Sequence, residues 1–500
     1  MARLSKRYHP SGAFAPERLP PLPEPEPQPE ARATAPEAFD TTDTARRGIA
    51  AGIWQRFAET SGYAAASADL RPVVIVRGEG SRVWDAEGRE YLDALAGLAG
   101  VNAGYGRTEI TEAMRAQFER IHVVSHPALP NVPGTVLAER LARLSPTGEG
   151  SRVFIVASAS EATETALKLA KAYHRARGFT GRYKTVSRRD ANHGITAGAL
   201  AVSGLAAAKN PYEPLVPGTL HVTLPDHTHC PYCANAEGCT LACADEVRRV
   251  IAYEGPESVA AVVLEPVQRV GCLVPPPGYY ERVRAACDEY GVLLIMDEAT
   301  CGFGRIGTMF ASEAFEIHPD IVTVADNLTS AYAPLGAVIA SHAVGDALAT
   351  NGDDTAAGDI PFASFGGSPV AAAAALANLD ILEREDLPGR ARDMGAYFLR
   401  ELQTAVGQHP HVGEIRGRGL LVGIALVRDR ETQVTLADTA LLAWLADEFP
   451  RRSLICRPDD HTSLLLLAPP LNIEREEIDR VVTIVTETLD ALTAKAGNEQ

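Results

Sequence analysis

The sequence predicts an α/β protein built on a mainly parallel sheet, with a separate α+β layer at its carboxyl-terminal end. From about Thr108, short apolar runs alternate with helix-like stretches, a pattern that is typical of parallel strands covered on both faces. Three of these runs end in an acidic residue. After Pro369, an Ala-rich helix leads into short strands and further helices, which predicts the second layer.

A tail precedes the folded sequence. Residues 16–37 are rich in Pro and Glu and bury too little apolar surface to fold, so we expect residues 1–43 to form a disordered, polyproline-like tail. Folded sequence is expected from Thr44. Between Val73 and Leu92, two short strands are predicted on either side of a polar turn at residues 85–88.

The acids at the ends of the apolar runs are candidate site residues. Glu265, Asp297 and Asp326 each follow directly after one of these runs. The stretch from Tyr279 to Tyr290 has a helical pattern, which fits a right-handed crossover between the first two strands. Ligands of open parallel sheets bind beyond the carboxyl ends of the strands. A single acid there is often a cap or a turn residue, whereas three acids at one edge predict a shared site.

A fourth strand, Arg152 to Val156, leads into a helix that begins with the pattern of a capping box. The hydroxyl of Ser158 is expected to accept a hydrogen bond from the backbone N–H of Glu161, whose side chain reaches back. The helix is expected to extend to about Ala176. Its unpaired N–H groups and positive dipole end form a natural phosphate-binding site, although most capped helices bind no ligand.

Composition restricts the classes of partner. The net charge of −17 argues against a nucleic-acid partner, because phosphate backbones bind basic surfaces. No apolar run is long enough for a membrane span, and no apolar block follows the basic residues near the amino terminus, as it would in a signal peptide. We therefore expect a cytoplasmic protein with a small-molecule ligand and neither a nucleic-acid nor a membrane partner.

Four of the eight cysteines lie close together within residues 221–245, with the spacing C-x2-C-x5-C-x3-C. Such spacing is able to ligate zinc, and three nearby histidines are further candidate ligands. The interpretation that we favour is a surface insert with small, partly buried thiols and no metal, because the second pair lacks the usual two-residue spacing. The four residues are Cys230, Cys233, Cys239 and Cys243.

Longer motifs carry a resemblance that extends over about residues 50–490. In order along the chain they are VWDAEGREYLDALAGLAGVNAGYGR (83–107), SASEATETALKLAK (158–171), NHGITAGAL (192–200), VVLEPVQ (262–268), PPPGYYERVRAACDEYGVLLIMDE (275–298), GFGRIG (302–307), DIVTVADNLTSAYAPLGAV (320–338), SFGGSP (364–369) and IRGRGLLVGI (415–424). In content and order these motifs resemble the class III (ω-) aminotransferases and are most similar to the amine:pyruvate branch. Members of this family are fold-type-I enzymes that use pyridoxal phosphate (PLP).

The resemblance implies a large α/β domain with a mainly parallel, seven-stranded type of sheet and a smaller α+β domain made from both ends of the chain. Residues 44–104 and 371–500 are expected in the smaller domain, and residues 105–370 in the large domain, with the Cys-rich insert at 221–245. Members of the family build each active site from two subunits, so a homodimer is expected.

Several residues match positions that bind the cofactor in the family. Asp297 matches the acid that pairs with the pyridine nitrogen of PLP, where a buried carboxylate keeps the nitrogen protonated. Ser364 matches a threonine that reaches the phosphate across the dimer interface. The resemblance assigns the phosphate cup to Ser158, Ala159 and Ser160. It assigns the strand-end pair to Glu265 and Gln268, and the segment beside the ring to Asn192 and His193.

Asp326 stands where the family has the lysine that bonds covalently to PLP and shuttles the substrate proton. A carboxylate cannot form an imine, so ordinary transamination is not expected. Other departures from the family pattern also fall at positions that contact the cofactor or the substrate in the family. Asn192 replaces the aromatic residue that stacks on the ring, Ala159 replaces a glycine of the phosphate cup, and Ala99 and Gly100 replace a Trp-Cys pair.

Three functions are compatible with this pattern. The first is a biosynthetic enzyme for small amino or keto compounds that binds PLP or pyridoxamine phosphate (PMP) noncovalently, with Asp326 as the base and His193 and Glu265 as further catalytic candidates. The second is a PLP-independent enzyme that reuses the same cavity for acid–base or metal chemistry, with Cys301 as an additional candidate. The third is a non-catalytic partner of an active enzyme.

Overall fold

The computed structural model describes residues 73–124, 129–226, 230–233, 238–349, 363–459 and 462–498. The tail expected at residues 1–43, and the start of the folded sequence expected at Thr44, lie outside the described residues. Within the described ranges, no helix is both long enough and apolar enough to cross a membrane.

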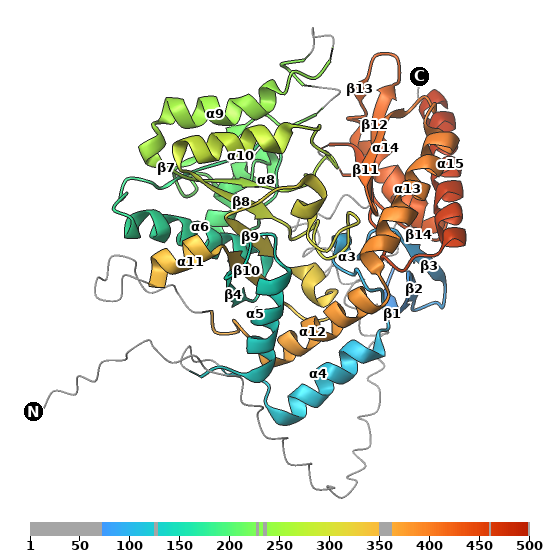
Figure 1. The fold of residues 1–500 in the computed structure, drawn as a ribbon. Helices are drawn as coiled ribbons and strands as arrows, with labels where there is room; N and C mark the ends of the chain where they lie inside the picture. Colours follow the sequence, from blue (N-terminus) through green and yellow to red (C-terminus); the bar gives the residue numbers. More distant parts are fainter. Residues whose placement is uncertain are drawn as a thin grey trace, which may run out of the picture. The chain divides into compact units, whose positions relative to one another are not determined.

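A seven-stranded sheet forms the centre of the α/β region (Figure 1). Its strand order is β4-β10-β9-β8-β7-β5-β6. β10 is antiparallel to both of its neighbours, and all other neighbouring pairs are parallel. The strands are β4 (Arg152–Val156), β5 (Lys184–Arg188), β6 (Thr219–Val222), β7 (Val259–Leu264), β8 (Leu293–Asp297), β9 (Ile321–Val324) and β10 (Gly336–Ala340). This arrangement confirms the mainly parallel, seven-stranded sheet that the sequence predicts.

Helices cover both faces of this sheet because its strands are apolar on both sides. The covering helices are α5 (Val132–Leu144), α6 (Ala159–Ala176), α9 (Ala242–Glu254), α10 (Tyr279–Tyr290), α11 (His342–Ala349) and α12 (Pro369–Arg384). Val263 in β7 packs in the core that includes α6 and α11, whereas the neighbouring Val262 packs in the core that includes the other four helices. Burial on both faces explains the continuous apolar runs in the sequence.

Shorter elements connect this framework. α4 (Thr108–Arg120) packs against α12. Further short helices include α7 (Ala197–Val202), α8 (Ala206–Lys209), η1 (Asn210–Tyr212), η2 (Pro256–Ser258), η3 (Ala311–Phe315) and η4 (Asp326–Thr329). η4 is a single 3-10 turn that starts two residues after the end of β9.

Three antiparallel strands precede α4, where the sequence predicts two. They are β1 (Ile75–Glu79), β2 (Arg82–Asp85) and β3 (Glu90–Asp93). The first predicted strand is interrupted at Gly80, which adopts a φ of +59° and exchanges backbone hydrogen bonds with Tyr105. A bend at a glycine therefore divides one expected strand into two.

The carboxyl-terminal region forms a second layer of strands and helices. Its strands are β11 (Val412–Arg418), β12 (Leu421–Asp429), β13 (Val434–Thr435) and β15 (Leu464–Leu467), and its helices are α13 (Leu387–Val406), α14 (Thr439–Arg451) and α15 (Arg475–Asn498). β12 pairs antiparallel with β11, β13 and β15. β14 (Leu454–Ile455) pairs in parallel with β3, so segments from opposite ends of the described chain share one sheet.

Candidate functional site

The carboxyl ends of the parallel strands meet at one edge of the central sheet. Asp297 lies opposite Thr323 across the β8–β9 pair, and Asp326 begins η4 just beyond β9. Glu265 follows β7, which runs parallel to β8. We call Glu265, Asp297 and Asp326 the strand-edge acids. The structure places all three at the edge where ligands of open parallel sheets bind.

Asp297 and His193 form a buried pair at this edge. Nδ1 of His193 lies 2.8 Å from Oδ2 of Asp297, and the two residues are only 2% and 5% exposed. Oδ1 of Asp297 accepts hydrogen bonds from Oγ1 of Thr323 (3.0 Å) and from the backbone N–H of Ala299 (3.2 Å). The backbone N–H of His193 donates to Oγ of Ser203 (2.8 Å). These contacts stabilise the buried carboxylate and fix its orientation.

Glu265 is buried beside this pair. Its Oε2 accepts a hydrogen bond from the backbone N–H of Asn192 (3.4 Å), and its Oε1 accepts one from that of Arg269 (3.1 Å). Burial raises the pKa of the Glu265 carboxyl above its ordinary value, while the nearby His193 opposes the shift. Glu265 therefore links the loop after β5 to the strand edge, and its carboxyl retains a proton more readily than that of an exposed glutamate.

Gln268 is completely buried and is anchored through its amide group. Its Nε2 donates to the backbone carbonyl of Arg189 (3.1 Å), while its Oε1 is buried and has no partner among the described residues. The Nε2 atom of His193 is also buried and unpaired within the described chain. Buried polar atoms without partners are uncommon in proteins. This part of the sheet edge therefore has unused hydrogen-bonding capacity.

The start of α6 provides hydrogen-bond donors. Ser158 is the N-cap, and its Oγ accepts from the backbone N–H of Glu161 (3.2 Å). The side chain of Glu161 reaches back to the backbone N–H of Ala157 (2.8 Å), one residue before the cap. Oγ of Ser160 accepts from the backbone N–H of Ile195 (3.0 Å). The first N–H groups of a helix have no partner within it, so this end of α6 is able to bind an anion.

The start of β10 lies against the start of α6. A Cβ atom at Gly336 would lie 2.6 Å from the carbonyl oxygen of Ser158, so the two backbones are in direct contact. Ala159, which the resemblance assigns to a phosphate cup, is the first residue of α6 and is half-buried. Since β10 enters the sheet from the loop that carries Asp326, this contact brings that loop and the helix start to the same edge.

Asp326 is the most accessible of the strand-edge acids. Its side chain is exposed in the single chain, whereas those of Glu265 and Asp297 are buried. Surrounding protein atoms still displace water from the Asp326 carboxyl, and this desolvation raises its pKa from the ordinary aspartate value. Within the described residues, no lysine, arginine or histidine forms an ion pair with Asp326. Asp326 is therefore positioned to meet a ligand.

A left-handed turn forms a wall next to Asp326. The four residues of α3 (Ala96–Ala99) have φ between +46° and +71°, a conformation that costs about 1–2 kcal/mol for each non-glycine residue. The buried guanidinium of Arg305 donates to the carbonyl of Ala99 (3.2 Å) and to two carbonyls of the carboxyl-terminal layer. A Cβ atom at the following residue, Gly100, would lie 3.3 Å from the Cβ of Asp326. Arg305 thus holds the strained turn against the site.

Three buried asparagines, which the sequence did not point to, fix the loop after β9. Nδ2 of Asn327 donates to the carbonyls of Thr300 (2.9 Å) and Gly302 (3.2 Å), which belong to the loop after β8. The carbonyl of Asn327 accepts from Nδ2 of Asn102 and from Nδ2 of Asn378, each at 2.9 Å. Asn327 therefore ties the two acid-bearing loops together. An amide residue directly after a strand-end acid was the only signal in the sequence.

Ser364 is exposed and lies in the loop that precedes α12. No hydrogen bond among the described residues joins Ser364 to the strand-edge acids or to the start of α6. The expected contact of Ser364 with a phosphate across a dimer interface stays a prediction.

The cysteine-rich insert contains free thiols. Cys230 and Cys243 are buried, Cys233 is half-buried and Cys239 is exposed. In the part of the chain that the structure describes, no group of three or more His, Cys, Asp or Glu side chains is arranged to hold a metal ion. Two of the nearby histidines, His227 and His229, lie outside that part.

Two further buried groups near the site have structural contacts. Sγ of Cys301 donates to the carbonyl of Val267 (3.1 Å), and burial raises the pKa of this thiol well above its ordinary value, which keeps it protonated and unreactive. Glu298 accepts hydrogen bonds from the hydroxyl and N–H of Ser312 and from the N–H of Ala311. Burial nevertheless raises the pKa of Glu298 to about 7.

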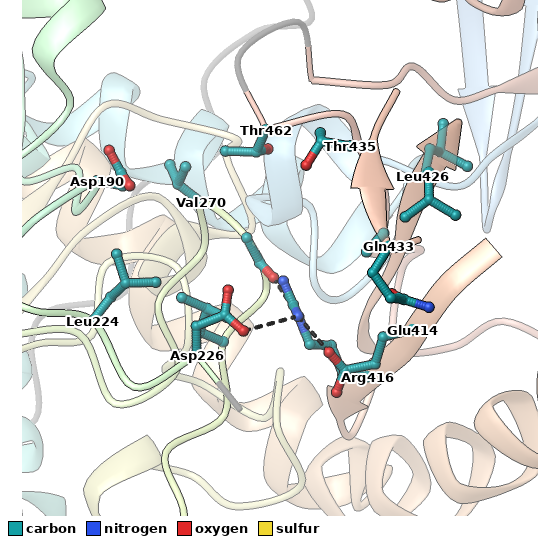
Figure 2. A pocket seen from close by; sticks show the side chains of 14 residues that line it. Asp190, Leu224, Asp226, Val270, Glu414, Arg416, Leu426, Gln433, Thr435 and Thr462 are labelled. Carbon is teal, nitrogen blue, oxygen red and sulfur yellow. Dashed lines mark hydrogen bonds and ion pairs between the residues drawn. The ribbon is translucent and has the colours of Figure 1, made fainter. Parts of the chain in front are cut away.

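A separate cavity of about 140 Å³ lies beside Arg416 (Figure 2). Nε of Arg416 donates to the carbonyl of Gly271 (2.8 Å), and its Nη1 donates to Glu414 (2.6 Å) and lies 3.9 Å from Asp226. These contacts connect β11 to the loop after β7. The lining of this cavity includes none of the site residues expected from the sequence, so it is distinct from the candidate site.

The strand edge offers the donors and acceptors that a phosphorylated pyridine requires. The buried carboxylate of Asp297 is an acceptor for a protonated ring nitrogen, because its contacts use only part of its four lone-pair positions. Ser158, Ser160 and the first turn of α6 offer donors for a phosphate. The unpaired Oε1 of Gln268 is an additional acceptor. The residues present therefore fit a PLP-type cofactor at its nitrogen and its phosphate.

Comparison with known proteins identifies the family. Residues 63–489 match the family model described as Aminotransferase class-III. The protein named "Probable aminotransferase Rv3329" from Mycobacterium tuberculosis is 42% identical over 445 residues, which cover 87% of this chain and 92% of that protein. This chain belongs to the class III aminotransferase family.

Solved structures have the same fold. An amine transaminase from an uncultivated Pseudomonas species, in its PLP-bound form, aligns with a TM-score of 0.81 and 34% identity, covering 86% of this chain and 97% of that chain. The ω-transaminase from Pseudomonas jessenii in complex with PMP aligns with a TM-score of 0.81 and 33% identity, covering 88% of this chain and 95% of that chain. These matches confirm the fold-type-I architecture.

Proposed function

We propose that this protein is a biosynthetic enzyme that acts on a small amino or keto compound and binds PLP or PMP without a covalent bond. In this proposal, Asp326 takes the place of the family's lysine. The observation that carries the proposal is the combination, at one sheet edge, of the buried Asp297–His193 pair with an acid, and no amine, just beyond β9. Relatives with the same fold have been solved with PLP or PMP.

The contacts that would hold the cofactor come from two sides of the sheet edge. Asp297, oriented by His193, accepts from the ring nitrogen, while Ser158, Ser160 and the first turn of α6 bind the phosphate. When bound, the protonated ring withdraws electrons from a substrate carbon. Asn192 offers an amide where the family has a stacking aromatic, so affinity depends more on the nitrogen and phosphate contacts.

Asp326 acts as the base in this proposal. Its carboxyl is accessible at the strand edge, and its raised pKa lets it take up a proton more readily than an ordinary aspartate. Glu265 and His193 act through other groups, because Glu265 holds the backbone of Asn192 and His193 holds Asp297. They are therefore positioning residues.

We also propose that the protein forms a homodimer. Large apolar side chains are exposed on α4 and just before and within α5, notably Phe118 (58% exposed), Leu129 (60%) and Val132 (73%). Both helices pack against α12, so these side chains lie on neighbouring elements. Exposed apolar surface of this kind typically marks an interface. In such a dimer, Ser364 contacts the phosphate bound by the partner subunit.

Absorbance spectroscopy of the purified full-length protein tests the proposal. Protein that has been incubated with PLP or PMP and desalted should retain the cofactor's absorbance. Borohydride treatment followed by denaturation should release the cofactor from the chain, because no lysine occupies position 326. Asp326→Lys is the matched variant, and after the same treatment it should keep PLP attached to the polypeptide.

A protein that stays colourless with both cofactor forms would overturn the proposal. Acid–base activity without the cofactor, or activity that depends on an added divalent metal, would then support a PLP-independent enzyme. Co-purification with an active aminotransferase would support a non-catalytic partner instead.

A further inference from the structure

We infer that Asp326 is a binding group for a primary ammonium, so that this site selects the amine form of the cofactor, PMP, over the aldehyde form, PLP. The inference rests on the proposed noncovalent cofactor and adds which form is bound in the resting protein. It concerns the charge that the chain presents at position 326, and it requires no reaction step.

The Asp326 carboxyl lies at the same sheet edge as the proposed cofactor contacts. Asp326 follows β9, whose Thr323 donates to Asp297 (3.0 Å), so the two acids stand at the ends of adjacent parallel strands. β10 returns from the same loop to the start of α6, where Gly336 contacts Ser158. Position 326 therefore lies between the ring-nitrogen acid and the phosphate-binding end of α6. It is also the accessible member of the strand-edge acids.

The surroundings of Asp326 within the described residues offer no cation that pairs with its carboxyl. A Cβ atom at Gly100 would lie 3.3 Å from the Cβ of Asp326 and 3.5 Å from the Cβ of Ala331, and neither Gly100 nor Ala331 carries a charge. His193 is already bound to Asp297, and the guanidinium of Arg269 acts on Glu265. The described chain therefore presents three carboxyl groups here without a cation that pairs with Asp326. A cationic ligand group complements this charge.

The two cofactor forms carry different groups, an amine in PMP and an aldehyde in PLP. A lysine at position 326 is complementary to an aldehyde, because an amine and an aldehyde combine. A carboxylate has the opposite preference, since it binds an ammonium through a charge-assisted hydrogen bond and gains nothing from a carbonyl oxygen. Primary amines are protonated at neutral pH. A hydrogen bond to a charged group of this kind corresponds to about a tenfold to hundredfold difference in affinity.

Isothermal titration calorimetry on the full-length protein tests the inference with three ligands. They are PMP, PLP and pyridoxine phosphate, which carries a neutral hydroxyl in place of the amine. We expect PMP to bind at least about tenfold more tightly than the other two. In Asp326→Asn, the affinity for PMP should fall to that for pyridoxine phosphate, while the affinity for pyridoxine phosphate should change less than about twofold.

A matched control and two outcomes complete the test. Asp438→Asn exchanges an acid at the start of α14 and should leave all three affinities unchanged. Circular dichroism of Asp326→Asn checks that the variant is folded. If the three ligands bind equally, or if Asp326→Asn keeps the preference for PMP, the inference is wrong and the proposed noncovalent cofactor stands. If none of the three binds, both are wrong.

Discussion

Replacement of Asn327 by alanine should weaken the site without removing any group that contacts a ligand. Asn327 donates from Nδ2 to the carbonyls of Thr300 (2.9 Å) and Gly302 (3.2 Å) and is almost fully buried. Each lost hydrogen bond costs about 1 kcal/mol, and a buried carbonyl left without a donor costs about 1–3 kcal/mol. The free energy of unfolding should therefore fall by about 2–4 kcal/mol. Because the loops after β8 and β9 separate, PMP should also bind about tenfold more weakly.

Urea unfolding, followed by circular dichroism at a fixed protein concentration, measures the first effect, and calorimetric titration with PMP measures the second. Asp438→Ala is the matched control, since Asp438 accepts from the N–H groups of Ala440 (3.0 Å) and Leu441 (3.1 Å) at the start of α14. It should lower stability by about 1–2 kcal/mol and leave the affinity for PMP unchanged. The reasoning fails if Asn327→Ala is as stable as the parent protein, or if the control weakens PMP binding equally.

Three further changes probe the surroundings of the site. Gly194→Ala should lower both stability and phosphate affinity, because Gly194 has a φ of +131° and a Cβ there would lie 2.6 Å from Oγ of Ser160. Gly178→Ala is the control, since a Cβ at Gly178 meets no atom within 4 Å and the change should cost only the backbone strain. Unfolding and phosphate titrations compare the two variants. The buried Glu298 has a pKa of about 7, so the free energy of unfolding that its protonated form contributes is complete below about pH 4.5 and is lost as the pH rises to about 7. Glu298→Gln should remove up to about 3 kcal/mol of this pH dependence in unfolding titrations. An unchanged dependence of stability on pH would contradict the raised pKa of Glu298. Arg305→Met should destabilise the protein by about 3 kcal/mol or more, since three buried carbonyls lose their donor. Arg305→Lys should recover only part of this loss. A melting temperature of Arg305→Met equal to that of the parent protein would refute the role of Arg305.

The positions of the strand ends are predicted well by the sequence. Buried parallel strands read as continuous apolar runs, so the first residue after each run is easy to locate. Glu265, Asp297 and Asp326 were found in this way, and the structure places them at one edge. The capping pattern at Ser158 and Glu161 is equally local, because it depends on residues three apart in one helix.

Contacts between distant segments could not be predicted in the same way. Asn102 and Asn378 meet at the carbonyl of Asn327 from positions 225 and 51 residues away, and nothing in their local sequence indicates this. The left-handed turn of α3 also depends on a distant residue, Arg305, because its strain is sustained only by contacts that the fold supplies. The bend at Gly80 could not be predicted because a glycine within a strand-like segment does not reveal the sign of its φ.

The backbone at position 326 is fixed by amide groups on other residues and not by its own side chain. Asn102, Asn327 and Asn378 hold the turn, while the carboxyl of Asp326 points to where solvent or a ligand can reach it. The residues that hold the backbone and the side chain that is exposed are thus separate at this position. A family built this way can exchange one functional group for another here and change its chemistry while its architecture remains intact.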